Sequence, residues 1–315
     1  MARGASITIS STPGAQRPSD VNTPALSNPS QPLFRSPLVE IGLFRCPTFH
    51  PQFNAGFTEG YDFVFPRNAV WIEHDGGKPF VADSTVVPLY NAGHPYRRRR
   101  IAAEGDRTDW FSVTPSLLRE MLASHGSPSA DAEWRLFRSD YARVDSRTFL
   151  IQRAVFDHVR RGEADAMFVE ESVIRILDRV LSNMFDCDRA GDSKPKHREL
   201  AEDARAYLNL TFDRPDGLTT LARAVQSSVF HLCRVFRLHA GVSIHDYRSQ
   251  LRMRRSLELL GERADDILSI ALTLGYSGHS HFTSAFHRTF GIRPSEFRTI
   301  SLRRRAAVVS SLKSP

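Results

Sequence analysis

Long apolar runs and a disulfide set of cysteines are both missing from this 315-residue sequence. No stretch of 18 consecutive apolar residues occurs, whereas a membrane-spanning helix needs about 20. Its three cysteines, Cys46, Cys187 and Cys233, are too scattered for a disulfide framework or a metal-binding motif. Arg3 and Arg17 are not followed by the apolar segment of a secretory signal. We therefore expect a cytoplasmic chain, in a reducing compartment and with no membrane partner.

The net charge of +7 is concentrated in the C-terminal third of the chain. Residues 197–305 hold 17 arginines against 11 acidic residues, together with seven of the twelve histidines. A basic surface confined to one domain is the electrostatic signature of a polyanion binder. Many basic domains bind no polyanion, so the charge gains meaning only together with a motif.

The first part of the chain changes from a polar tail to a series of short strands. Residues 1–32 are rich in small and polar residues and are predicted to be a disordered tail. Between Val39 and Val113, runs of β-branched and aromatic residues alternate with turn signals such as Asp75-Gly-Gly-Lys78. Short, evenly spaced strands of this kind favour a β-sandwich or barrel, with a jelly roll most plausible.

Helices are predicted after the strands, over about residues 145–161 and 164–186. The second has an apolar stripe formed by Met167, Ile174, Leu177, Leu181 and Met184, with Val173 and Val180 beside it. Such a stripe usually packs on its own domain, and a contact between subunits is the alternative. The polar, proline-containing residues 191–198 are predicted to be a linker, which closes a first domain at 33–190.

A pattern that occurs twice, fifty residues apart, is the most specific feature of the sequence. Ser228–Arg237 matches Gly278–His287. Upstream the register changes by one, and Leu218, Leu221, Ala222 and Val225 match Ile267, Ile270, Ala271 and Leu274. Two copies of a helix, a short turn and a second helix indicate a tandem helix-turn-helix, with units at about 218–239 and 267–290. Two recognition helices in one chain point to double-stranded DNA.

Within each unit, apolar spacing separates an inward face from an outward face. In the first unit Leu232, Val235 and Phe236 should face inward. The outward face then presents four candidates for DNA contact: Phe230, Cys233, Arg234 and Arg237. Arg234 can pair with guanine and Arg237, one turn further, with phosphate. In the second unit the candidates are His279, Ser280, His281 and Ser284.

A helix over about Ser243–Leu260 is predicted to join the two units. Ser243 can cap this helix, with Asp246 as its capping partner. A rigid connection would place the two recognition helices about 34 Å apart, which is one turn of DNA.

Five segments carry a resemblance to a known family: Ser228–Arg237, Gly241–Ser243, Arg252–Leu260, Ile270–Tyr276 and Phe286–Arg298. In this order and spacing they resemble the C-terminal domain of AraC/XylS-family transcriptional regulators. The resemblance implies a DNA-binding domain at 199–302, and its groove contacts correspond to Phe230, Cys233 and Arg234 and to the four residues of the second unit. Tyr61–Arg97 more loosely resembles the cupin-like sensor domains joined to it. That implies an effector-sensing and dimerisation domain at 33–190, with RNA polymerase as a further partner.

The sequence departs from the family pattern at three positions. Gln226 stands where the first turn usually has glycine, which should cost strain unless the turn is rearranged. Ser284 and His287 replace a common arginine and a common lysine. We therefore expect the first unit to dominate the affinity for DNA.

Other candidate sites are weaker. His50, Glu73, His74 and His94 form no metal-binding motif, so no metal ion is expected. The run Arg97–Arg100 can attract an acidic effector or simply be solvated, and the second is favoured. Trp71, Tyr90, Tyr96 and Trp110 are more plausibly core than pocket lining. Cys233 is more plausibly a small groove-facing residue than a redox switch.

The sequence therefore predicts a two-domain α+β protein: a cupin-like jelly roll with following helices, then an all-α tandem helix-turn-helix domain. The predicted function is that of a sequence-specific bacterial transcriptional regulator that responds to a small-molecule effector of unknown identity and has no catalytic residues or cofactor. Two alternatives stay open. One is a cupin-type metal-dependent enzyme with an accessory basic domain, and the other is a regulator without an effector. A homodimer is expected for the regulator.

Overall fold

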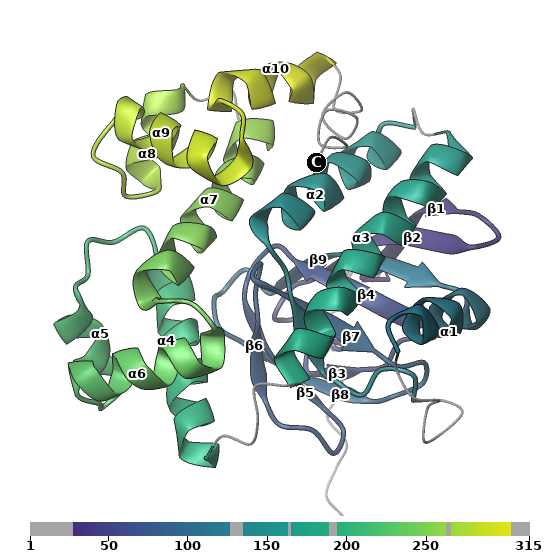
Figure 1. Cartoon of the computed structure of the whole chain (residues 1–315), viewed down its shortest axis with the longest axis horizontal. Helices are drawn as coiled ribbons and strands as arrows, with labels where there is room; N and C mark the ends of the chain where they lie inside the picture. Colours follow the sequence, from purple (N-terminus) through teal and green to yellow (C-terminus); the bar gives the residue numbers. More distant parts are fainter. Residues whose placement is uncertain (1–27, 127–134, 163–164, 189–193, 263–265, 304–315) are drawn as a thin grey trace, which may run out of the picture.

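The computed structural model describes residues 28–126, 135–162, 165–188, 194–262 and 266–303 (Figure 1). The strands are β1 Ser30–Arg35, β2 Val39–Cys46, β3 Ala55–Gly56, β4 Tyr61–Pro66, β5 Val70–His74, β6 Phe80–Ala82, β7 Val86–Tyr90, β8 Tyr96–Arg100, β9 Asp106–Val113 and β10 Tyr141–Arg143. The helices are α1 Pro115–Ser124, α2 Ser146–Arg160, α3 Ala166–Asp188, α4 Pro195–Thr211, α5 Leu218–Ala224, α6 Val229–Ala240, α7 Ile244–Glu262, α8 Ile267–Thr273, α9 His279–Phe290 and α10 Pro294–Arg303. The expected two-domain α+β class is confirmed, with a β-rich N-terminal domain and an all-α C-terminal domain.

In the described part of the chain, no helix combines the length and apolar character needed to cross a bilayer.

The strands of the N-terminal domain form two antiparallel sheets that pack against each other. The larger sheet has the order β1-β2-β9-β4-β7-β10 and the smaller one β3-β8-β5-β6. Strand β4 shows how alternation builds the two faces. Phe63 and Phe65 belong to the core shared with the helices, while Val64 between them packs on the core between the sheets.

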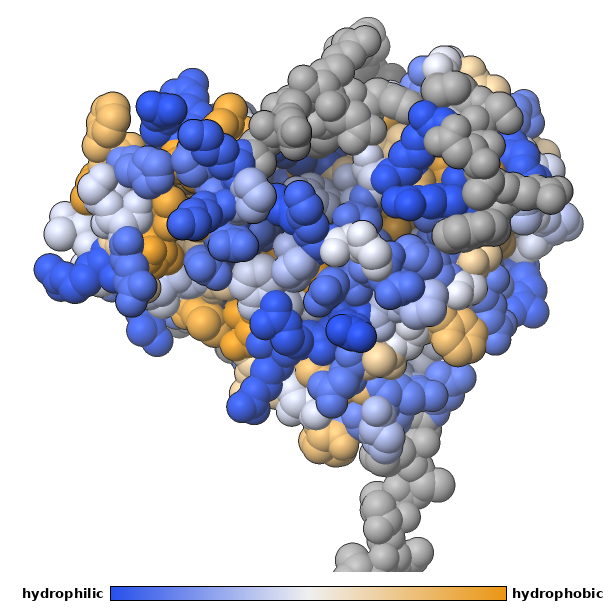
Figure 2. Space-filling view, turned by 90° about the horizontal axis from the view of Figure 1, so that it is seen from below, coloured by the Kyte–Doolittle hydropathy of each residue, from blue (hydrophilic) through white to orange (hydrophobic). Residues whose placement is uncertain are grey.

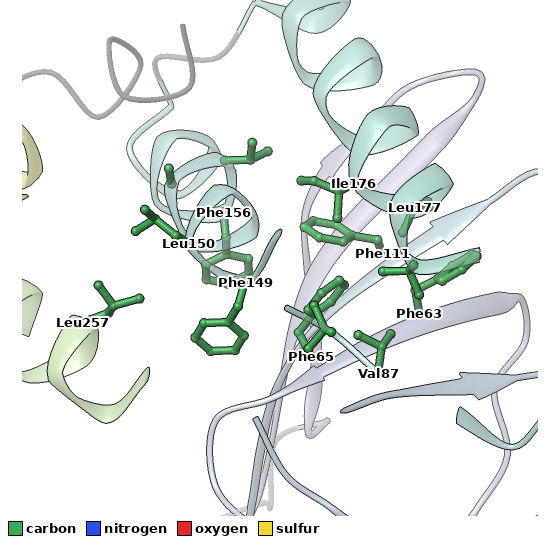
Figure 3. Close-up of a cluster of buried hydrophobic side chains, with 14 of the residues drawn as sticks. Phe63, Phe65, Val87, Phe111, Phe149, Leu150, Phe156, Ile176, Leu177 and Leu257 are labelled. Atoms are coloured by element: carbon green, nitrogen blue, oxygen red, sulfur yellow. The ribbon is translucent and has the colours of Figure 1, made fainter. Parts of the chain in front are cut away.

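Helices α2 and α3 cover the outer face of the larger sheet (Figure 3). Ile176 and Leu177 of α3 lie against Phe63 and Phe111 of the sheet in this view. The apolar stripe predicted on α3 is therefore core of its own domain, as the first interpretation held. Met167 is the exception, because it is 76% exposed.

The C-terminal domain consists of two helical units joined by α7. We call α4–α6 the first head and α8–α10 the second head. Capping residues start the helices: Ser228 Oγ accepts the His231 N–H of α6 at 3.2 Å, and Asp266 accepts the Ser269 N–H of α8 at 2.7 Å. Gly241 ends α6 in the left-handed conformation, with φ of 74°. These local signals fix the boundaries of the helices that were predicted from the repeat.

Two segment boundaries differ from those read from the sequence. Strand β1 begins at Ser30, inside the tail predicted at 1–32, and residues 1–27 lie outside the described part of the chain. Helix α4 begins at Pro195, inside the linker predicted at 191–198, of which 191–193 lie outside the described part. Proline is well suited to the first turn of a helix, so its presence did not require an extended linker.

The two domains meet along α7, which lies beside α2 (Figure 1). Arg254 of α7 is fully buried and donates hydrogen bonds to the backbone carbonyls of Ser84 and, at 2.7 Å, Val144. Its guanidinium lies 5.2 Å from the ring centre of Phe149. Burial lowers the pKa of Arg254 to about 10. The interface between the domains is thus packed and partly ionic.

Candidate nucleic-acid interface

Helices α6 and α9, the predicted recognition helices, bury and expose the same positions, fifty residues apart. Leu232, Val235 and Phe236 of α6 are buried, and so are Phe282, Ala285 and Phe286 at the equivalent positions of α9. His231, Arg234 and Arg237 are exposed, and so are His281, Ser284 and His287. The inward face predicted from the spacing is the one that the structure buries. Both helices therefore present one free face to the solvent, as a recognition helix requires.

In the first head, three of the four predicted contact residues stand on this free face. Phe230 is 80% exposed, and Arg234 and Arg237 are exposed as well. Neither arginine forms an ion pair with another residue in the described ranges. Cys233 differs, because it is half-buried and packs against the core of the first head. The structure thus places Cys233 at the border between the two faces of α6.

In the second head, all four predicted residues, His279, Ser280, His281 and Ser284, are exposed. The Nδ1 atom of His281 lies 3.1 Å from the Ser277 hydroxyl. Its ring packs edge-on against Tyr276, with 5.2 Å between the ring centres. His281 is therefore held in place before any ligand binds.

The two turns that precede the recognition helices have the same left-handed conformation. Gln226 has a φ of 53° and is the one non-glycine residue with positive φ in the part of the chain that the structure describes. Gly275, at the equivalent position, has a φ of 75°. The first turn is thus not rearranged to suit Gln226, and the expected strain is present.

A hollow recurs beside each recognition helix. The first has a volume of about 430 Å³ and lies between α4, α5, α6 and the start of α7. The second has about 490 Å³ and lies between α8, α9 and the start of α10. Four lining positions of the first hollow, Leu218, Cys233, Arg237 and Ser243, correspond in the repeat to Ile267, Thr283, His287 and Arg293 of the second. The sequence repeat therefore includes the residues that line the hollows as well as the helices themselves.

Both hollows have a basic rim. Arg237, Arg248 and His245 line the first, and His279, His287 and Arg293 line the second. An acidic residue, Asp216, also lines the first, and its carboxylate accepts a hydrogen bond from Tyr207 at 2.8 Å. Sequence reasoning missed Arg248 and His245, which lie on α7, and Arg293, which directly precedes α10, because all three follow the recognition helices in the chain. All three residues follow the repeated segments at a short distance along the sequence, and extending the comparison of the two repeats by a few residues could have revealed them.

The histidines considered for a metal site are not brought together. His74 Nδ1 lies 3.1 Å from Asp140, and the His74 and His94 rings are 6.2 Å apart between centres. No group of three or more His, Cys, Asp or Glu suited to a metal ion occurs within the described ranges. His50 Nδ1 instead accepts the Gln52 N–H at 3.2 Å.

The space between the two sheets is occupied by the protein's own side chains. Arg98 is buried there, 2.7 Å from Asp106, and donates hydrogen bonds to the Tyr96 hydroxyl at 2.7 Å and the Phe53 carbonyl at 3.0 Å. Tyr90 packs on Tyr96, with 4.9 Å between ring centres. Arg98 therefore differs from the solvated edge predicted for Arg97–Arg100, since alternation along β8 turns it inward.

The aromatic residues considered as pocket lining are also separated. Tyr90 and Tyr96 are core, while Trp71 is only partly buried, and Arg99 lies 5.3 Å from its ring centre. Trp71 borders a hollow of about 310 Å³ together with Arg97 and Arg99. Tyr90, Tyr96 and Trp110 do not line this hollow.

Comparison with known proteins identifies the C-terminal domain. Residues 221–300 match a family described as "Helix-turn-helix domain". The "Probable transcription factor PqrA" of Proteus vulgaris is 30% identical over 101 residues, which are 31% of this chain and 83% of that protein. The "Arabinose operon regulatory protein" of Escherichia coli (strain K12) is 22% identical over 243 residues, 76% of this chain and 80% of that protein. The chain belongs to the AraC/XylS family of transcriptional regulators.

The first curated relatives are similar to this chain over only part of their length. The chain spans about a third of the length of the first curated relatives that it matches, namely 33%, 28% and 31%. The crystal structure of ToxT from Vibrio cholerae O395 is similar over 84% of this chain and 98% of its own, with 12% identity and a TM-score of 0.34. Because the AraC/XylS family consists of transcriptional regulators, the comparisons give no support to the metal-dependent enzyme.

Proposed function

We propose that this AraC/XylS-family chain is a sequence-specific, DNA-binding transcriptional regulator of the bacterial cytoplasm that inserts α6 and α9 into two successive major grooves. The observation that carries this proposal is the free face that both helices repeat, with the same positions buried underneath. A major groove admits one α-helix, and successive grooves on one side of a duplex are about 34 Å apart. Two heads joined by the single helix α7 suit this spacing.

The exposed side chains suggest different tasks for the positions on α6. Arg234 can donate two parallel hydrogen bonds to guanine, and Phe230 can contact the methyl group of thymine. Arg237 lies on the rim of the first hollow and suits a phosphate. On α9, Ser280, His281 and Ser284 offer short polar groups to the bases. We expect the first head to supply most of the affinity. Its helix α6 carries two arginines, Arg234 and Arg237, where α9 has Ser284 and His287.

The paired hollows suit the sugar–phosphate strands that border each groove. Leu218, Leu221 and Ile244 give the first hollow an apolar floor under its basic rim. A DNA strand presents an anionic phosphate and an apolar deoxyribose in alternation. Because the same hollow occurs in both heads, a ligand that itself repeats along its length explains it better than a small effector would.

We further propose that the N-terminal domain makes the regulator responsive, through a small-molecule effector or a second subunit, and that RNA polymerase is a partner at the promoter. Family membership supports these partners. The exposed side of α3 carries charged residues, including the Glu171–Arg175 pair at 2.7 Å. We therefore do not assign a homodimer contact to α3. The alternative without an effector is favoured by one observation: Arg98 and Asp106 form a buried ion pair between the sheets, where an effector would otherwise be expected to bind.

The proposal is tested by footprinting the full chain on a duplex that it selects from a random-sequence library. We expect protection over about two helical turns, and an affinity that falls steeply with salt because several phosphates are neutralised. A duplex of the same composition in scrambled order is the control and should bind with much lower affinity. Equal binding to both duplexes, or protection of a single groove, would contradict the proposal.

A further inference from the structure

The two heads are attached to the N-terminal domain by different kinds of contact. The buried side chains of the second head, such as Phe282 and Phe286, belong to the same hydrophobic cluster as α2, α3 and the sandwich. Leu257 of α7 extends this cluster toward Leu150 of α2 (Figure 3). The core of the first head is a separate cluster. Apolar burial therefore fixes the second head, whereas the first head depends on polar contacts.

Asp83, in the turn between β6 and β7, is the centre of these polar contacts. It is 1% exposed, and its carboxylate accepts hydrogen bonds from the Tyr247 hydroxyl and, at 2.8 Å, from the Asn209 side-chain amide. Arg205 lies 3.4 Å from the same carboxylate. On the side of its own domain, Thr85 donates its N–H and its hydroxyl at 2.8 and 2.6 Å. One carboxylate of the N-terminal domain thus holds α4 and the start of α7 together.

Neighbouring contacts strengthen this attachment of the first head. Glu202 of α4 accepts the backbone N–H of Val81 at 2.6 Å. Strand β6 is at the edge of its sheet, so this N–H has no neighbouring strand as a partner. Arg143 of β10 donates a hydrogen bond to the His239 carbonyl in the last turn of α6. The N-terminal domain therefore contacts the recognition helix of the first head directly.

The charge on Asp83 is part of the contact. Burial alone would raise the pKa of this carboxyl, but Arg205 and the hydrogen bonds from Thr85 and Tyr247 outweigh it and hold the pKa below its ordinary value. Asp83 is therefore ionised at neutral pH. Removing the charge leaves Arg205 with Glu202 as its remaining anionic partner in the interface. Breaking a buried ion pair by removing one partner is strongly destabilising. Hydrogen bonds also require a particular geometry, whereas apolar contacts are not directional.

We infer that Asp83 is a positioning residue for DNA reading, which orients the first head relative to the second and so selects the spacing of the two half-sites. This inference rests on the proposed function, in which both heads bind one duplex. Moving one half-site by a single base pair shifts it by roughly 3.4 Å and rotates it by roughly 35°. A first head fixed by Asp83 accepts one spacing. A first head without this contact adapts to neighbouring spacings.

The experiment measures affinity for three duplexes: the one selected by the wild-type chain, and two derivatives with the half-sites moved apart by one and two base pairs. The variants are Asp83→Asn, which removes the charge, and Tyr247→Phe, which removes the donor to Asp83 and the acceptor for Arg205 and Asn209. Tyr247→Phe keeps the ring that packs on Phe236. Asp106→Asn is the matched control, because Asp106 is a buried aspartate of the same domain whose arginine partner, Arg98, lies in that domain.

We expect wild type and Asp106→Asn to discriminate against the shifted duplexes by at least tenfold. In Asp83→Asn this ratio should fall at least threefold, and in Tyr247→Phe it should fall in the same direction by less. If both variants lose affinity for all three duplexes by one common factor, Asp83 has only a structural role and the inference is wrong. Should Asp83→Asn not fold, Tyr247→Phe alone decides.

Two results for the wild-type chain separate the inference from the proposed function. Selective binding with equal affinity for all three spacings overturns the role of Asp83 and leaves the proposed function intact. Failure to select any duplex from the library refutes the proposed function itself.

Discussion

Arg234 and Arg237 lie one turn apart on the same exposed face, yet we expect their removal to have different effects. Arg234→Ala should cost about 1–3 kcal/mol on the preferred duplex and flatten the preference at one base position, because its contact is with a base. Competition binding with single-base variants of the selected site measures both effects.

Arg237→Ala is the matched comparison for this prediction. We expect it to weaken binding to all sequences alike and to reduce the salt dependence by about one phosphate equivalent. If Arg234→Ala instead behaves like Arg237→Ala, with unchanged base preference, Arg234 does not take part in reading the sequence.

For individual residues, the sequence predicted well which side chains of α6 and α9 are exposed. It predicted poorly the half-buried residues and the residues that other helices place beside them. Helical spacing was sufficient for Arg234 and for His281, because an inward apolar stripe defines the opposite face. Cys233 was assigned to the free face although it follows Leu232 directly, and one residue along a helix turns it by only about 100°. Arg248 joins the first hollow from another helix, which no spacing within α6 can reveal.

Turns and helices form the next scale, and the repeated turn offers a test there. Gln226→Gly should stabilise the chain by about 0.5 kcal/mol, because glycine avoids the cost of the left-handed conformation but also gains freedom in the unfolded state. Chemical denaturation of the two proteins measures the difference.

Gly275→Ala is the reciprocal variant at the equivalent position. A Cβ atom there would overlap the carbonyl oxygen of Asp213 in addition to the strain. We expect a loss of more than about 1 kcal/mol. A neutral Gly275→Ala together with a destabilising Gln226→Gly would show that the two turns do not share one conformation.

Most helices were predictable, because caps, glycines and apolar spacing are local signals. Ser228 and Ser243 mark helix starts in the sequence, and both accept the expected backbone N–H groups. The contacts between domains were not predictable. Nothing in the sequence indicated that Arg254 and Glu258 are buried, or that Glu258 pairs with Arg67 of the N-terminal domain. A charged residue on a helix carries no sign of whether a distant segment will cover it.

For the whole molecule, the shared hydrophobic cluster predicts that both domains unfold together. All three tryptophans, Trp71, Trp110 and Trp134, lie in the N-terminal half, so tryptophan fluorescence follows that domain. Far-UV circular dichroism at 222 nm follows the helices, most of which lie in the C-terminal domain. We expect the two signals to give coincident denaturation curves at neutral pH.

Arg67→Ala should separate the two curves, because it leaves Glu258 without its partner across the interface. Separate transitions already in the wild-type chain would mean that the interface is too weak to couple the domains.

Polar and apolar patches lie side by side on the face of the molecule drawn in Figure 2. The most consequential asymmetry, however, lies between the two heads. Their interiors repeat, while their outward side chains have diverged, as in Arg234 against Ser284. Because the two heads carry different side chains, they can bind an asymmetric operator in one orientation only. Under the proposed function, a bound chain therefore has polarity, with its N-terminal domain on a defined flank of the site. Inverting the operator would carry that domain to the opposite flank, so even a single molecule distinguishes upstream from downstream.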